Sequence, residues 1–152
     1  SEAARIKAKG SVSCAGWPLS ERFGQCEGTL PGREMHLDHI VPLRAGGIND
    51  SKNLQPMCGT CNRKKSAQIA PDMTFDEILV LIHSDYHHVI NRGDSNPTIE
   101  RKLKAHLVDR ILTSIQEGSY EDKVRALKRR VNGQWDVERV VKKGKEWSKN
   151  QR

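Results

Sequence analysis

Aromatic residues are scarce in this chain, which has two Phe, three Trp and two Tyr in 152 residues. A protein that binds single strands by stacking bases on aromatic platforms needs more of them, so the sequence argues against that class. Long apolar runs are also missing, and none approaches the roughly 20 residues that span a bilayer. Without a charged and apolar leader at the start, we expect an intracellular (cytoplasmic) protein with no membrane partner.

Acidic residues are outnumbered by basic ones, 19 against 26, which gives a net charge of +7 and an isoelectric point near 9.4. This excess favours a polyanionic partner, and nucleic acid is the first candidate. Residues 1–70 hold ten basic and six acidic side chains, residues 71–100 hold one and six, and residues 101–152 hold 15 and seven. Two basic ends around an acidic middle fit two surfaces that face nucleic acid, although a charge run can also be a solvated face.

The length suits one ordinary domain, or a small catalytic module with an appended helical part. Residues 1–13 are basic with little apolar content and predict a mobile N-terminal arm. Residues 14–34 are rich in Gly, Pro and Cys, which indicates a loop-rich lobe. Further along, the pattern predicts a strand over His36–Pro42, a turn over Ala45–Asp50, a strand over Asn53–Met57 and a helix over Asn62–Ile69.

Residues 71–152 predict a mainly α-helical region. Thr74 and Glu77 form the pattern of a capping box, and apolar residues at helical spacing follow it up to Gly93. Pro97 predicts the start of a second helix, which closes at Gly118. Further helices are predicted from Ser119 and from Asp136. We expect this region to add DNA contacts or a homodimer surface.

Four cysteines predict a structural metal site. Cys58 and Cys61 have the spacing of half a zinc site, and in a reducing compartment such residues are better explained as thiolates on a metal than as disulfides. Cys14 and Cys26 are 12 positions apart, so the chain between them must return to the metal. Bound zinc could contribute on the order of 10 kcal/mol to folding. The alternatives are a site in which His36 replaces one cysteine, or buried free thiols.

Asp38, His39 and Asn62 carry the chemistry of a second site. A histidine can take a proton from water, an effect worth roughly 10²–10⁴ in rate. Asp38 points to the opposite face of a regular strand from His39, so we expect it to hold a metal. Asn62 could supply a second oxygen ligand, and such ligands favour Mg²⁺ or Mn²⁺. The alternative for Asn62 is a helix cap.

These residues resemble the HNH endonuclease family, whose fold is two short antiparallel strands and a helix that grip a metal. The resemblance covers residues 14–70 and rests on three sequence blocks: LDHIVPL at 37–43 with Gly46-Gly47, NLQP at 53–56, and CGTCNRKK at 58–65. It implies an α+β fold with a small ββα-metal core and a zinc-tied lobe, followed by the helical region.

The resemblance implies a role for each motif residue. Asp38 would be a ligand of a catalytic Mg²⁺ or Mn²⁺ ion, and His39 the general base. Asn53 would fix the loop between the strands and orient His39. Asn62 replaces the last histidine of the motif as second metal ligand, which makes this an HNN variant. The products would be a 5′-phosphate and a 3′-hydroxyl, because the metal would stabilise the leaving 3′ oxygen.

The resemblance also implies a surface for double-stranded DNA. The short helix of this fold lies along the minor groove, so Arg63, Lys64 and Lys65 would meet phosphates, unless they form a solvated helix face. A second group of basic residues could contact DNA or act only as a solubilising face: Lys123, Arg125, Lys128, Arg129 and Arg130. Two alternatives to a DNA endonuclease are a zinc-stabilised binding module that does not cut, and a nuclease acting on RNA.

Overall fold

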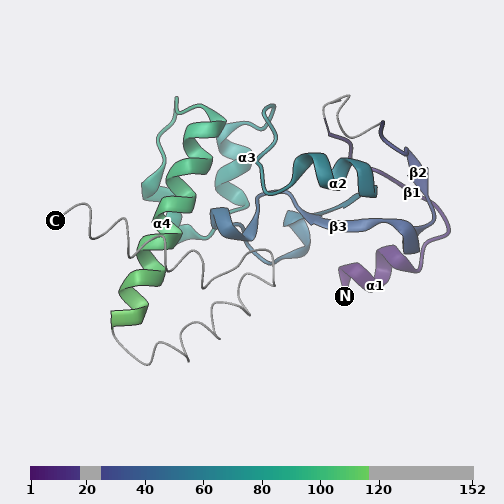
Figure 1. Cartoon of the computed structure of the whole chain (residues 1–152), viewed down its shortest axis with the longest axis horizontal. Coiled ribbons are helices and arrows are strands. Elements are labelled where there is room, and N and C mark those ends of the chain that lie inside the picture. The colour runs from purple at the N-terminus through teal and green to yellow at the C-terminus, as the bar shows by residue number, and fades with distance from the viewer. Residues whose placement is uncertain (18–24, 117–152) are drawn as a thin grey trace.

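The computed structural model describes residues 1–17 and 25–116 (Figure 1). Its elements in chain order are α1 (Glu2–Lys7), β1 (Val12–Ser13), β2 (Thr29–Leu30), η2 (Gly32–Glu34), β3 (His36–His39), η3 (Leu43–Ala45), η4 (Ser51–Asn53), β4 (Leu54–Met57), α2 (Gly59–Lys65), α3 (Phe75–Val80), η5 (Ser84–Val89) and α4 (Asn96–Gln116). The prefix η marks 3₁₀ helices.

The centre of the molecule is a hairpin of β3 and β4 with α2 packed against it (Figure 1). The strands are antiparallel, and Asp38 pairs with Gln55 while His39 pairs with Leu54. The predicted strand, loop, strand and helix are therefore present, and the α+β class with a small ββα core is confirmed.

Helix α2 is shorter than predicted and begins earlier, over Gly59–Lys65 instead of Asn62–Ile69. It begins at Gly59 because the Cys58 side chain accepts the N–H of Cys61 and caps the helix. It ends at Lys65 because Ser66 adopts a φ of 50°, which leaves the right-handed helical path.

The prediction of a mobile arm over residues 1–13 is wrong for residues 2–7 and 12–13, which form a helix and a strand. Residues 2–7 form α1, and Ile6 from this helix is buried beside Met35 and Met57. Val12 and Ser13 then pair with Leu30 and Thr29 as the hairpin β1–β2. One buried isoleucine in a basic segment is a weak signal in the sequence, but it is enough to dock the helix.

The loop between β3 and β4 needs both of its adjacent glycines. Gly46 has a φ of 74°, and a Cβ atom there would lie 2.7 Å from the ring of Tyr86. A Cβ atom on Gly47 would lie 2.0 Å from the carbonyl oxygen of Val41. No side chain fits at either position, so the pair lets the loop fold tightly against the helical region.

The capping box at Thr74 is confirmed, since Thr74 and Glu77 exchange both hydrogen bonds. The helix it opens ends at Val80, however, and does not continue to Gly93. The next residues pair with the loop instead: Ile48 donates to the Leu81 carbonyl at 2.9 Å and His83 donates to the Gly46 carbonyl at 3.0 Å. This pairing interrupts the helix, and a 3₁₀ helix, η5, follows it.

Helix α4 confirms the prediction of a helix near Pro97 and buries Ile99, Leu103 and Leu107. With α3 and η5 it forms one apolar core. A second core lies around Met57 and includes Cys58 and Cys61. The hairpin and α2 lie between these two regions (Figure 1). The helices predicted from Ser119 and Asp136 fall outside the described residues. Across residues 1–17 and 25–116, no helix has the length and apolar composition to cross a membrane.

Candidate nuclease site and metal centre

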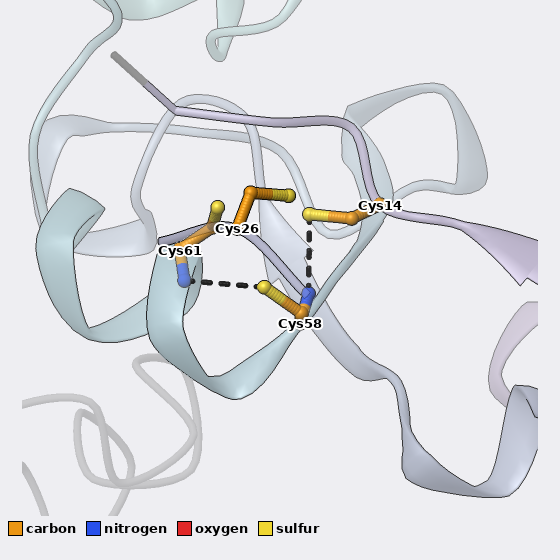
Figure 2. Close-up of side chains that lie close together, drawn as sticks. All are labelled: Cys14, Cys26, Cys58 and Cys61. Atoms are coloured by element: carbon orange, nitrogen blue, oxygen red, sulfur yellow. Dashed lines mark hydrogen bonds between the residues drawn. The ribbon is translucent and has the colours of Figure 1, made fainter. Parts of the chain in front are cut away.

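The four cysteine sulfurs converge on one point, as Figure 2 shows. The Sγ atoms of Cys14, Cys26, Cys58 and Cys61 all lie within 4.8 Å of one another. In a tetrahedral zinc site with Zn–S bonds of about 2.3 Å, the sulfurs are about 3.8 Å apart. The predicted four-cysteine grouping is therefore present, and it could bind a metal ion.

The hairpin β1–β2 explains the wide spacing of Cys14 and Cys26. Cys14 directly follows β1, and Cys26 lies three residues before β2. The N–H of Cys14 donates to the Gly28 carbonyl at 2.9 Å, which continues the pairing toward Cys26. An antiparallel hairpin thus brings the two cysteines together, as a close Cys-x-x-Cys spacing would.

Backbone N–H groups point at the sulfurs. Cys14 Sγ accepts from Cys58 and Gly16 at 3.2 and 3.3 Å, and Cys58 Sγ accepts from Glu27 and Cys61, both at 3.4 Å. Burial opposes ionisation of the Cys58 thiol, but the N–H groups of Glu27 and Cys61, together with the side chains of Cys61 and Cys14, outweigh it and lower its pKa to about 7. Burial raises the pKa of Cys61 to about 12. A bound cation would be needed to hold all four as thiolates, so the donor set fits a metal.

The alternative with His36 as a ligand is not what the structure shows. Among the described residues, the one group of three or more possible His, Cys, Asp or Glu ligands consists of the four cysteines. His36 is exposed at the start of β3, and its Nε2 lies near Gly59 outside this group.

Asp38 is buried on the face of β3 that meets α2. One of its oxygens, Oδ2, accepts a hydrogen bond from Gln55 Nε2 at 2.9 Å and lies 3.2 Å from Lys65 Nζ. Burial raises the pKa of Asp38, and the Lys65 ammonium opposes that rise. Burial likewise lowers the pKa of Lys65, and Asp38 opposes that fall. The pair is therefore a buried ion pair in which each charge depends on the other.

His39 projects toward the loop and away from Asp38, as the alternation of a strand predicts. Its Nε2 lies 3.1 Å from Asn49 Oδ1, and the residue is 6% exposed. A carboxamide oxygen can only accept, so the contact requires the proton on Nε2. Asn49 was not among the predicted site residues, because an asparagine in a predicted turn is explained by the turn alone.

Asn53 is fully buried, and its side chain bonds to the loop between the strands. Its Nδ2 donates to the carbonyls of Val41 and Ile48 at 2.9 and 2.8 Å, and its Oδ1 accepts the N–H of Val41 at 2.9 Å. Its own carbonyl accepts the N–H of Ile40, the residue after His39, at 2.8 Å. Asn53 thus holds the loop, and it bears on His39 only through the backbone.

Asn62 lies inside α2 and is half-buried. The alternative of a helix cap does not apply, because Cys58 occupies the N-cap position. Asn62 precedes Lys65 by three residues, so both lie on one side of the helix. Lys65 reaches Asp38 from there, which places Asn62 on the α2 face that meets β3.

The three basic residues at the end of α2 do not share one environment. Arg63 is exposed, whereas Lys64 and Lys65 are 7% and 1% exposed. Lys65 donates to the His39 carbonyl at 2.9 Å and pairs with Asp38. The cleft that it borders, about 360 Å³ in volume, is also lined by Asp72 and Glu77.

The structure does not favour the predicted phosphate contact of Lys65, since its buried charge already faces the Asp38 carboxylate. The periodicity of α2 could not show this, because the ion pair depends on the docking of α2 against β3. Arg63 keeps the predicted exposed position. The predicted basic group at Lys123, Arg125, Lys128, Arg129 and Arg130 lies outside the described residues.

Residues 24–68 match the family model described as HNH endonuclease. The search of curated proteins and the search of solved structures each gave no match. The matched segment contains Cys26, the hairpin β3–β4 and all of α2. The predicted resemblance to the HNH endonuclease family is confirmed for this part of the chain.

Proposed function

We propose that this protein is a metal-dependent endonuclease that hydrolyses phosphodiester bonds of double-stranded DNA. The observation that carries the proposal is the end of β3, where Asp38 and His39 face opposite sides within the HNH match. The Asp38 side meets α2, the helix that contains Asn62, and the His39 side meets the loop. A phosphodiester placed across this strand end would have a metal ligand and a base on its two sides.

His39 acts as general base in this proposal. Asn49 Oδ1 lies 3.1 Å from Nε2 and helps to orient the ring, and a neutral imidazole can accept a proton from water. Asn53 keeps the loop that carries Asn49 in place through its bonds to Val41 and Ile48. The loop thus orients the base, and it does so through two asparagines.

Asp38 and Asn62 are the proposed ligands of a catalytic Mg²⁺ or Mn²⁺ ion. Carboxylate and amide oxygens suit such hard cations. Asp38 Oδ2 is held by Gln55 and Lys65, while Oδ1 makes no hydrogen bond within the described part of the chain and is the oxygen left for a cation. When bound, the metal would stabilise the charge on the leaving 3′ oxygen.

Zinc is the proposed ion of the four-cysteine centre, with a purely structural role. All four positions of a tetrahedron would be filled by sulfur, which leaves none for substrate. The centre ties β1–β2 to α2 through Cys14 and Cys58, so it would fix one end of the helix that carries Asn62.

Duplex DNA is proposed as substrate because of the net charge of +7 and the exposed Arg63 beside the site. A plasmid-cleavage assay with Mg²⁺ or Mn²⁺ tests the proposal, with Asp38→Asn as the matched variant. We expect the wild type to convert supercoiled DNA to nicked or linear forms, and the variant to be slower by about 100-fold or more.

Two further measurements separate the alternatives: competition between structured RNA and duplex DNA, and a DNA-binding assay. Cleavage of structured RNA in preference to duplex DNA would identify an RNA nuclease. DNA binding without cleavage by the wild type, in both metals and on several substrates, would leave a zinc-stabilised binding module and refute the nuclease.

A further inference from the structure

The Asp38–Lys65 pair is the most deeply buried ion pair among the described residues. Asp38 is 7% exposed and Lys65 is 1% exposed, with 3.2 Å between Oδ2 and Nζ. The other ion pairs have at least one partner that is 20% exposed or more. A buried carboxylate is strongly unfavourable without a nearby positive charge.

Lys65 is held firmly where it lies. Its ammonium donates to the His39 carbonyl at 2.9 Å and lies 5.9 Å from the centre of the Trp17 ring. Its three contacts therefore come from a carboxylate, a carbonyl and an aromatic face, all of which attract a cation. This environment fixes the ammonium beside Asp38 whether or not another cation is near.

We infer that Lys65 is the built-in countercation of Asp38: it balances the carboxylate when no divalent ion is bound, and it lowers the affinity of the site for that ion. This inference rests on the proposed function, in which Asp38 holds the catalytic metal. Lys65 is here a positioning residue, because it acts through Asp38.

The charges of the site explain the lowered affinity. Asp38 carries the single negative charge of the proposed ligand pair, since Asn62 is neutral. A cation on Oδ1 must share that charge with the ammonium on Oδ2 of the same carboxylate. The phosphate of a nucleic acid would add the missing negative charge. Tight metal binding therefore requires the substrate.

Binding of Mn²⁺ to the 152-residue chain, loaded with zinc, tests this without any cleavage. Free Mn²⁺ is followed by electron paramagnetic resonance in the absence of nucleic acid, for wild type, Lys65→Met and the double variant Asp38→Asn with Lys65→Met. We expect Lys65→Met to bind Mn²⁺ about tenfold more tightly than the wild type or better. The double variant should lose this gain, because the carboxylate is gone.

Thermal unfolding provides a second readout. Without Mn²⁺, Lys65→Met should melt well below the wild type, because the buried carboxylate has lost its partner. Mn²⁺ should raise its melting temperature by more than that of the wild type. If Lys65→Met does not fold, Lys65→Gln replaces it with the same expectations, since its amide can still donate to the His39 carbonyl.

Lys102→Met is the matched control. It removes the lysine of another ion pair, in which Lys102 Nζ lies 2.8 Å from Asp94 Oδ2 in the helical region. Its Mn²⁺ affinity should equal that of the wild type. Lys65→Arg, which keeps the charge, should bind Mn²⁺ no more tightly than the wild type.

The inference is overturned if Lys65→Met binds Mn²⁺ no better than the wild type, or if the double variant keeps the gain. Failure of the proposed function would look different. A wild type that cleaves no nucleic acid would refute the nuclease, while the Mn²⁺ titrations would still decide the role of Lys65.

Discussion

Asn53 has no exposed surface, and its side chain makes three hydrogen bonds to the backbone of the loop between the strands. We expect Asn53→Ala to lower the free energy of unfolding by about 3 kcal/mol, because it leaves buried backbone groups of Val41 and Ile48 without partners. Denaturant unfolding of the zinc-loaded protein measures this. The exposed Asn91→Ala is the control, with an expected change below about 0.5 kcal/mol. A similar small change in both would contradict this role.

Asn49 is exposed and contacts the His39 ring. We expect Asn49→Ala to reduce the cleavage rate about tenfold or more, because the imidazole loses a hydrogen-bond partner that helps to orient it. The free energy of unfolding should change by less than about 1 kcal/mol, since the hydrogen bond is partly exposed. Cleavage rate and denaturant unfolding, measured on the same preparation, separate the two effects. An unchanged rate would mean that Asn49 does not orient the base.

Among single residues, those with distinctive chemistry could be identified from the sequence. Those whose role depends on how α2 packs against β3 could not. Asp38, His39, Asn53, Cys58 and Cys61 stand in recognisable blocks of sequence, and Cys14 and Cys26 are the remaining cysteines of the chain. Gln55 could have been found, because the hairpin register puts it opposite Asp38. The pairing of Lys65 with Asp38 joins residues 27 positions apart, and helical periodicity contains no information about it.

Among the elements, α3 depends on its capping box. Thr74 Oγ1 accepts the N–H of Glu77 at 3.2 Å, and Glu77 returns a bond to the N–H of Thr74. We expect Thr74→Ala to cost about 1 kcal/mol in the free energy of unfolding. Thr113→Ala, which removes an exposed hydroxyl from α4, should cost less than about 0.5 kcal/mol under the same denaturant. Equal losses would show that the cap adds nothing specific.

The bounds of helices and strands could be predicted where local sequence signals set them. They could not be predicted where contacts between distant parts of the chain set them. Local pattern was enough for β3, β4 and the start of α3. The break after Val80 comes from backbone pairing between Leu81 and Ile48, which belong to distant parts of the chain. The early start of α2 comes from Cys58, which caps the helix. The sequence around Cys58 indicates metal binding and gives no sign of this second role.

For the whole molecule, the four-cysteine centre joins hairpin β1–β2 to the start of helix α2. We expect one zinc per chain, lost in Cys58→Ser together with much of the cooperative unfolding transition, because the ion would stabilise folding on the order of 10 kcal/mol. Metal analysis and thermal unfolding measure both. His36→Ala should keep its zinc. Zinc retained in Cys58→Ser, or lost in His36→Ala, would contradict the ligand set.

The central claim is that the end of β3 is the catalytic centre of a nuclease, and single-turnover cleavage tests it most directly. Labelled duplex DNA is mixed with excess protein and Mg²⁺, and the wild type is compared with His39→Ala at equal DNA occupancy. The account predicts a rate lower by roughly 10²–10⁴ in the variant, with unchanged DNA affinity. Equal rates for the two proteins would contradict it.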